Sequence, residues 1–259
     1  IIFEPQPIEY FAPERAPKRL ARFREKIAYL KAQQLDYLLC LHFDARLAAQ
    51  SAEDIVQKIL LQSLNTRHLV IGDDFHFGKN RQGNFEFLQH NSARFGFTVD
   101  ETETLMEDGE RVSSTRIRDC IEQGDFEKAA QLLGRPYSLS GRVAHGQKLG
   151  RQLGYPTINI KMGDKTLIVK GIFAVRVKGI DNRVLEGVAS IGTRPTVAGV
   201  DTILEVYILD FDRDVYGYSV EVEFLHKLRD EQKFDSLEEL TFHIGRDTEN
   251  AIAYFRRDE

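Results

Sequence analysis

The spacing of apolar and polar positions changes near residue 137 and divides the chain into two regions. In the first region, short apolar runs alternate with segments of helical period. The expected strands are 1–3, 36–43, 67–72 and 97–103, and the expected helices are 18–34, 51–64 and 84–95. This alternation predicts a parallel sheet with helices on both faces.

Two short helices close the first region, and strands dominate the second. Ser113 or Ser114 caps the first of these helices, and Gly124 and Gly134 end the two. Strand-like runs then follow at 141–144, 171–177, 184–191, 204–209 and 220–224, and a last helix begins at Ser236. The pattern predicts an α/β domain over 1–137 and an antiparallel β-barrel or sandwich with a C-terminal helix over 138–259.

Composition narrows the function classes. The 259 residues carry a net charge of −5, which argues against nucleic-acid binding. Cys40 and Cys120 are the only cysteines, which fits a reducing cytosol, and no apolar run is long enough for a membrane helix. We expect a cytoplasmic protein without a nucleic-acid or membrane partner. Because the chain begins at Ile1, we also expect that residues precede it.

A glycine-rich segment carries the densest chemical signal. Residues 141–154 contain four glycines, whose backbone can approach a ligand closely and cradle phosphates. Lys148 and Arg151 add positive charge. Thr157 and Asn159 share one side of an extended segment and suit Mg²⁺ beside phosphate oxygens. The alternative is that the glycines only form tight barrel turns.

Residues 146–159 resemble the nucleotide-binding signature of riboflavin kinases, centred on the sequence Gly-Tyr-Pro-Thr-Ile-Asn at 154–159. Further blocks at 171–175, 190–196, 205–217 and 228–234 follow in the family's order, so the resemblance covers 138–259. Ile158 and Val215 are mild departures from the usual alanine and leucine.

This resemblance implies a Greek-key β-barrel that transfers phosphate from ATP to riboflavin and yields FMN. It implies Glu205 as the general base, Arg229 and Phe234 as flavin-binding residues, and Mg²⁺ at Thr157 and Asn159. The implied ATP-binding residues are Gly146, Lys148, Gly150, Gly154, Pro156, Thr157 and Asn159. The plainer alternatives are a solvent-facing Glu205, a surface Arg229 and a core Phe234.

Residues 113–118 place hydroxyl groups and two arginines at a helix N-terminus, which favours an anion, although an ordinary helix cap explains them too. This segment resembles the second ATP motif of bacterial FAD synthetases, and residues 3–7 and 72–83 also match that family. The resemblance implies a Rossmann-like nucleotidyltransferase domain that adenylylates FMN to FAD. Its implied ATP- and FMN-binding residues are Asp74, Phe77, Ser113, Ser114, Thr115 and Arg118.

Nearly the whole chain therefore resembles bacterial bifunctional riboflavin kinase/FAD synthetases. The departure is the family's His-x-Gly-His loop, which the sequence does not contain and which should precede residues 3–7. If the residues of that loop are absent from the protein, we expect no adenylyl transfer, and if they precede Ile1, we expect both activities. The alternatives are a monofunctional kinase with a degenerate first half and a non-catalytic flavin- or nucleotide-binding regulator. We expect a monomer or weak homo-oligomer.

Overall fold

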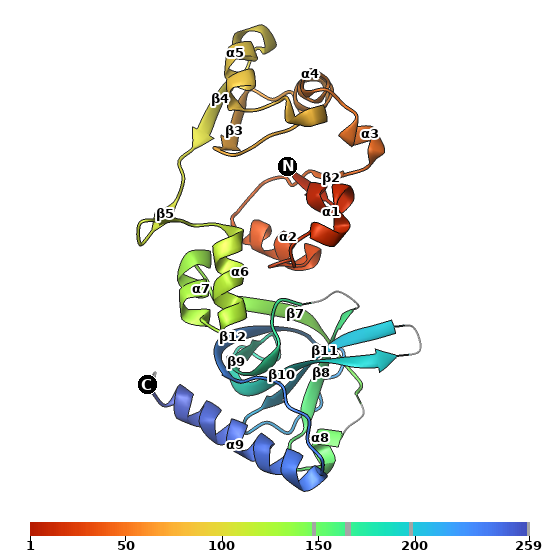
Figure 1. Ribbon diagram of the computed structural model, residues 1–259, viewed down its shortest axis with the longest axis vertical. Coiled ribbons are helices and arrows are strands. Elements are labelled where there is room, and N and C mark those ends of the chain that lie inside the picture. The colour runs from red at the N-terminus through yellow and green to blue at the C-terminus, as the bar shows by residue number, and fades with distance from the viewer. Residues whose placement is uncertain (147–148, 164–166, 197–198, 258–259) are drawn as a thin grey trace. The chain divides into compact units, whose positions relative to one another are not determined.

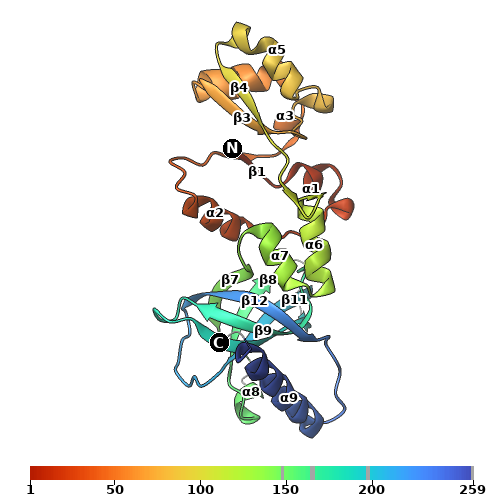
Figure 2. The same ribbon diagram turned by 90° about the vertical axis from the view of Figure 1, so that its left-hand side faces the viewer.

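The computed structural model describes residues 1–146, 149–163, 167–196 and 199–257 (Figures 1 and 2). The chain divides into two compact units. The first comprises Ile1–Pro17 and Tyr29–Val112, and the second comprises Lys18–Ala28 and Ser113–Glu259. A segment of the first half of the sequence therefore belongs to the same unit as the predicted barrel. The boundary predicted after residue 137 stays a prediction.

The first unit contains short helices and two pairs of parallel strands. β1 pairs with β2, and β3 pairs with β4, both in parallel, within the described residues. Its elements are β1 (Ile2–Glu4), α1 (Pro7–Phe11), η1 (Pro13–Arg15), β2 (Cys40–His42), α3 (Ala45–Ala48), α4 (Ala52–Asp54), η2 (Ile55–Ser63), β3 (His68–Gly72), η3 (Lys79–Arg81), α5 (Phe85–Phe95), β4 (Thr98–Thr102), β5 (Met106–Glu107) and β6 (Glu110–Arg111). α2 (Phe23–Ala32) contributes its end to this unit and its beginning to the second.

Helix caps in the first unit follow the sequence closely. The Ser51 hydroxyl accepts a hydrogen bond from the Asp54 amide at 3.0 Å, as expected for the helix predicted at 51–64. The Asn84 side chain caps α5 in the same way, and Gly96 ends this helix in the left-handed conformation. Side chains of η2, β3 and α5, among them Val56, Ile71 and Leu88, form the core of the unit.

Two predictions for the first half were wrong in detail. The strand expected over 36–43 is limited to Cys40–His42, and Tyr37 is 94% exposed. Among the residues that the structure describes, β2 has a hydrogen-bonded neighbour only on the β1 side, so an apolar run there is not covered as it would be inside a sheet. The helix expected over 18–34 begins at Phe23, and its one buried residue is Glu25 instead of an apolar side chain.

The second unit is built on a closed six-stranded barrel with the order β10-β11-β8-β7-β12-β9, and all neighbouring pairs are antiparallel. The predicted antiparallel barrel is confirmed. The elements of the unit are α6 (Ser114–Gln123), α7 (Phe126–Leu133), β7 (Tyr137–Ala144), α8 (Leu149–Gln152), β8 (Thr157–Gly163), β9 (Gly171–Lys178), β10 (Leu185–Thr196), β11 (Gly199–Ile208), β12 (Ser219–Arg229) and α9 (Leu237–Phe255).

Helices pack against this barrel through apolar side chains. Phe126 of α7 contacts the rings of Phe173 and Phe224, with centroids 5.5 and 6.0 Å away. On another face, Ala251 and Phe255 of α9 pack in a cluster with barrel residues. The Ser236 hydroxyl caps α9 by accepting from the Glu239 amide at 3.1 Å, as predicted.

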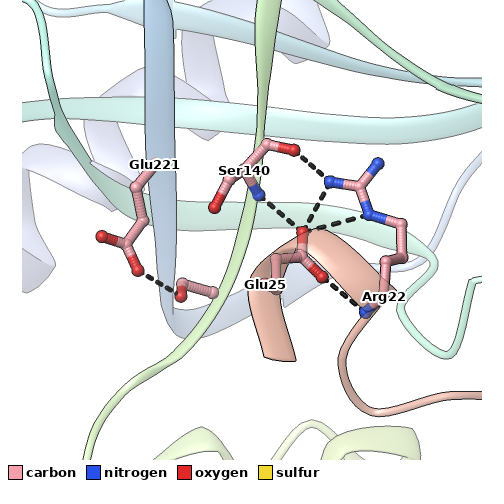
Figure 3. A network of polar contacts seen from close by, with 5 residues as sticks. Arg22, Glu25, Ser140 and Glu221 are labelled. Atoms are coloured by element: carbon pink, nitrogen blue, oxygen red, sulfur yellow. Dashed lines mark hydrogen bonds and ion pairs between the residues drawn. The ribbon is translucent and has the colours of Figure 1, made fainter. Parts of the chain in front are cut away.

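The beginning of α2 is fixed to strand β7 by a buried carboxylate (Figure 3). Glu25 is only 1% exposed and accepts hydrogen bonds from the backbone amides of Ser140, at 2.9 Å, and Arg22, at 2.7 Å. The Arg22 guanidinium donates both to Glu25 and to the Ser140 carbonyl oxygen. This closed network explains why an acidic residue is the buried one on α2, because each carboxylate oxygen receives donors that replace water.

Candidate active site

Strands β8 and β11 present polar side chains on the outer face of the barrel. Along β11, Leu204 and Val206 are fully buried, and Glu205 between them points to the opposite face. The register pairs Glu205 with Asn159 of β8 and Tyr207 with Thr157. Directly opposite residues of adjacent strands lie about 5 Å apart at their Cβ atoms, so the predicted base and metal-binding residues are cross-strand neighbours.

A cavity of about 240 Å³ lies over this face. Thr157, Asn159 and Glu205 line it, together with Ser190 of β10, which is the cross-strand partner of Glu205. The other sides come from the α8 region, from the loop after β12 and from α9. The lining is mixed, with apolar side chains such as Ile172 and Ile244 beside these polar groups.

The glycines of the predicted phosphate loop lie close to strand β8 and to the residues just before it. A side chain at Gly146 would place a Cβ atom 2.4 Å from the Asn159 amide carbon. A Cβ atom at Gly150 would lie 2.4 Å from the Tyr155 carbonyl oxygen. Contacts below 3 Å are not tolerated, so the loop backbone can approach Asn159 of β8 and the Tyr155 carbonyl before it only without side chains at these positions. Lys148 lies outside the described residues.

A second cavity of about 530 Å³ adjoins the first at Thr157, which lines both. Gly154 and Pro156 line this second cavity, and Gly154 has a φ of 87° that favours glycine. Arg151 and residues 211–216 also line it, together with apolar barrel residues such as Val143 and Ile208. Thr157 therefore stands between two cavities, each bordered by part of the glycine-rich segment.

Arg229 and Phe234 both line the first cavity. The Arg229 guanidinium carbon lies 5.5 Å from the centre of the Phe234 ring, a cation–π distance. Arg229 also donates two strong hydrogen bonds to Asp247 of α9, at 2.8 and 2.7 Å. The two residues predicted to bind flavin, one at the end of β12 and one in the loop after it, are thus in contact at one side of the cavity.

Partial burial perturbs two other groups of this cavity. Desolvation, followed by the neighbouring Asp210 and Tyr155, raises the pKa of Tyr207. Desolvation also raises the pKa of Glu231, while Lys170 lowers it to a smaller extent. Both shifts have the sign expected for acids at a poorly hydrated surface.

In the first unit, Asp74 and Phe77 have different surroundings. The Asp74 carboxylate is largely exposed and lies 3.0 Å from the Arg111 guanidinium. Phe77 is 9% exposed and packs in the core beside Phe75 and Phe87. Phe77 also lines an apolar cavity of about 300 Å³ within this unit. The ligand contacts predicted for Asp74 and Phe77 stay predictions.

The remaining predicted adenylyltransferase residues lie in the second unit, at the start of α6. The Ser113 hydroxyl caps this helix by accepting from the Arg116 amide at 3.2 Å. Ser114 and Thr115 are exposed in the first turn. Arg118 donates from Nε to the Lys18 carbonyl oxygen at 2.7 Å, and burial lowers its pKa. One of its donors is thus used within the protein, and the roles predicted for these residues stay predictions.

Sequence reasoning did not select Ser190, Tyr207 or Asp247 as site residues. Ser190 and Tyr207 reach the cavity through the strand register, a long-range property that a local pattern does not show. Asp247 had a detectable signal, because it is an acidic residue at the helical spacing of the buried positions Ala251 and Phe255.

Comparisons with known families match both halves of the chain. A sequence model of the riboflavin kinase family matches residues 133–255. A sequence model of the FAD synthetase family matches residues 1–116. The two matches follow each other in the order that the motifs predicted.

Individual relatives match along nearly the full chain. The bifunctional riboflavin kinase/FMN adenylyltransferase of Escherichia coli (strain K12) is 45% identical over 255 residues, covering 98% of this chain and 82% of that protein. The protein of the same description from Pseudomonas fluorescens is 48% identical over 254 residues, covering 98% and 81%. The one from Haemophilus influenzae is 44% identical over 255 residues, covering 98% and 83%.

A solved structure supports the fold. The crystal structure described as a macrolide-efflux protein from Streptococcus pneumoniae superposes with a TM-score of 0.78 at 29% identity, covering 96% of this chain and 81% of that one. Among the described residues, no helix combines the length and apolar character that spanning a membrane requires. From its two family matches and its near full-length relatives, the chain belongs to the bifunctional riboflavin kinase/FMN adenylyltransferase family of flavin cofactor biosynthesis.

Proposed function

We propose that the barrel unit transfers the γ-phosphate of ATP to riboflavin in the cavity bordered by Glu205, Thr157 and Asn159. The observation that carries this proposal is the cross-strand pairing of Glu205 with Asn159 inside one cavity. A solvent-facing carboxylate elsewhere on the barrel would have no such partner, so the pairing argues against the plainer interpretation of Glu205.

The two cavities suggest how the substrates are divided. The first cavity, with its apolar wall and Phe234, suits the isoalloxazine ring and ribityl chain of riboflavin. The second cavity, bordered by Gly154, Pro156 and Arg151, suits ATP. Thr157 then stands where the γ-phosphate meets the ribityl 5′-hydroxyl.

In this arrangement Glu205 accepts the proton of the 5′-hydroxyl as the oxygen attacks the γ-phosphorus. The new bond joins the 5′-oxygen to phosphorus, the bond from phosphorus to the β,γ-bridging oxygen breaks, and the products are FMN and ADP. Phosphoryl transfer depends mainly on positioning and charge stabilisation. The backbone of Gly146 closely approaches Asn159, and the backbone of Gly150 closely approaches the Tyr155 carbonyl oxygen. This close packing fits the need for positioning.

The residues present fit a Mg²⁺ ion. Thr157 supplies a hydroxyl and Asn159 an amide oxygen on one face of β8, and the Asn159 amide nitrogen lies 3.4 Å from the Thr157 carbonyl oxygen, which orients the side chain. Mg²⁺ is usually held by one or two protein oxygens together with substrate phosphates. When bound, the ion neutralises charge on the phosphate oxygens.

We also propose that the chain adenylylates FMN with ATP to give FAD, as the description of its relatives states for those proteins. The Rossmann-like arrangement belongs to this proposal, and the parallel pairs β1–β2 and β3–β4 support it. The exposed hydroxyls at the start of α6 suit an anionic ligand. The expectation that residues precede Ile1 stays a prediction, which intact mass together with an FAD-forming assay tests.

Turnover assays with Glu205→Gln test the kinase proposal. Loss of a general base lowers kcat by roughly 10²–10⁴-fold. We therefore expect FMN formation from riboflavin and MgATP to fall by that factor, whereas riboflavin binding, followed by its fluorescence, stays close to that of the wild type. Unchanged kcat in this variant would exclude Glu205 as the base.

Glu186→Gln is the matched control. Glu186 lies on β10, also half-buried, and lines neither cavity. The control should keep wild-type kinase turnover. Riboflavin binding by the wild type without any turnover would instead support the non-catalytic regulator.

A further inference from the structure

Helix α9 carries a charged residue within its buried stripe. Asp247, Ala251 and Phe255 follow each other at intervals of four residues and are 4%, 0% and 5% exposed. The last two pack in an apolar cluster with barrel residues such as Ile172 and Val188. An apolar residue at 247 would continue this packing, so the carboxylate requires a separate explanation.

Arg229 at the end of β12 is the partner of this carboxylate. Its Nε donates to Asp247 Oδ1 at 2.8 Å, and a terminal nitrogen donates to Oδ2 at 2.7 Å. The side chains are only 19% and 6% exposed for Arg229 and Asp247. The remaining terminal nitrogen donates to the Asp230 carbonyl oxygen at 3.0 Å. The guanidinium is therefore held in one plane by contacts on several sides.

Stability alone does not account for such a pair. Desolvation of two charges offsets most of their attraction, and apolar replacements of a buried pair are often neutral or stabilising. A bidentate carboxylate contact does fix the orientation of the guanidinium plane, which a flexible arginine side chain cannot fix by itself. The benefit of Asp247 is therefore orientation.

What is oriented lies at the cavity. Both Arg229 and Asp247 line it, and the Arg229 guanidinium carbon lies 5.5 Å from the centre of the Phe234 ring. His243, one helical turn before Asp247, stacks on Phe234 with ring centroids 4.8 Å apart. Helix α9 thus contacts both Arg229 and Phe234, the arginine through Asp247 and the phenylalanine through His243.

We propose that Asp247 is a positioning residue for flavin binding, which holds Arg229 and, through it, Phe234 at the wall of the riboflavin cavity. This inference rests on the proposed function in one respect, namely that riboflavin occupies this cavity. Asp247 takes no part in phosphoryl transfer. Its loss should weaken riboflavin binding and leave ATP binding unchanged, because the second cavity contains neither Asp247 nor Arg229.

The test measures the equilibrium Kd for riboflavin by fluorescence quenching and the KM values for riboflavin and ATP. Asp247→Asn removes the charge without changing the shape of the side chain. Because a charged hydrogen bond to Arg229 is lost, we expect both the Kd and the KM for riboflavin to rise about tenfold. The KM for ATP should stay the same. Asp247→Glu keeps a carboxylate and should restore most of the affinity. Adding Asp247→Asn to Arg229→Ala should weaken binding no further, since coupled residues are not additive.

Glu223→Gln is the matched control, because Glu223 is a buried carboxylate 8% exposed that pairs with Lys178 and lies outside both cavities. It should alter stability without altering the Kd for riboflavin. An unchanged riboflavin Kd in Asp247→Asn, or an equal rise in the KM for ATP, would overturn the proposal. A wild-type chain that binds riboflavin but forms no FMN would instead refute the kinase function, while the Kd series would still decide the role of Asp247.

Discussion

The two units differ in how their strands are covered. Every strand of the barrel has hydrogen-bonded neighbours on both sides, whereas β1 to β4 of the first unit each have one among the described residues. Inner residues of the barrel such as Leu204 and Val222 are fully buried, but Val70 on β3 is 54% exposed. An edge strand keeps unpaired backbone groups and incomplete packing, and a closed barrel has no edges.

This difference affects the candidate sites. In the barrel, Glu205 and Asn159 are held opposite each other by the register of two strands that are paired on both sides. In the first unit, Asp74 and Phe77 lie in the segment that follows β3, and one of them is exposed and the other is a core residue. The residues proposed for the kinase site are therefore neighbours in the barrel, whereas Asp74 and Phe77 have different surroundings in the first unit.

Among the remaining changes, Gly146→Ala should have the largest effect, which is a loss of FMN formation in the barrel unit. The added methyl group would lie 2.4 Å from the Asn159 amide carbon, so Asn159 or the loop must move. A displacement of about 1 Å at a reacting centre can lower the rate by roughly 10²-fold. Steady-state FMN formation should fall by about that factor.

The matched control for this change is Gly134→Ala. Gly134 has a φ of 69°, and beyond its chain neighbours no atom lies within 4 Å of the position that an added Cβ atom would take. The substitution strains the backbone by roughly 1–2 kcal/mol but touches no residue of the cavity. Equal kinase losses in the two variants would show that the close approach of Gly146 to Asn159 does not matter for catalysis.

Glu25→Gln should have the next largest effect, and it extends the comparison to the segment 18–28. The amides of Arg22 and Ser140 donate to different oxygens of Glu25, so glutamine keeps an acceptor for one of them and presents an NH₂ group to the other. An unsatisfied buried group costs about 2 kcal/mol. Hydrogen exchange of the β7 amides at equilibrium should show an opening free energy lower by that amount.

Glu53→Gln serves as the control for Glu25→Gln. Glu53 forms an exposed ion pair with Arg94 in the first unit, at 2.5 Å, and such pairs contribute little. Its replacement should leave exchange from β7 unchanged. Unaltered exchange from β7 in Glu25→Gln would mean that the segment 18–28 does not stabilise the barrel unit.

Local sequence signals predicted the features that depend on neighbouring residues. Ser51, Ser113 and Ser236 cap helices because their hydroxyls reach amides three residues ahead, an arrangement that the sequence displays directly. Most barrel strands were also predicted, since alternation with short turns is a local pattern, whereas β8 was not among the predicted strands and was expected only as an extended segment at Thr157 and Asn159.

Features that depend on distant partners were not predicted. The apolar run at 37–41 carried no information about which strand would cover it, and Tyr37 is exposed. Glu25 appeared as one acidic residue in a helix, because its donor Ser140 lies 115 positions away. For the site, the motifs named Thr157, Asn159 and Glu205, but the pairing with Ser190 and the support from Asp247 required the register and the packing of α9.

The smallest expected effect concerns the two cysteines, one in each unit. Cys40 on β2 is exposed, whereas Cys120 on α6 is half-buried, and desolvation followed by the nearby Asp125 raises the pKa of its thiol. The thiolate is the reactive form, and each unit of pKa increase reduces its population about tenfold at neutral pH. Iodoacetamide at pH 7.5 should therefore alkylate the half-buried Cys120 more slowly than the exposed Cys40, as peptide mass spectrometry can measure. Because the raised pKa is the cause, a higher pH should increase the rate at Cys120.

Equal rates at the two cysteines would show that α6 opens readily, and would remove this contrast between the covered second unit and the exposed strands of the first.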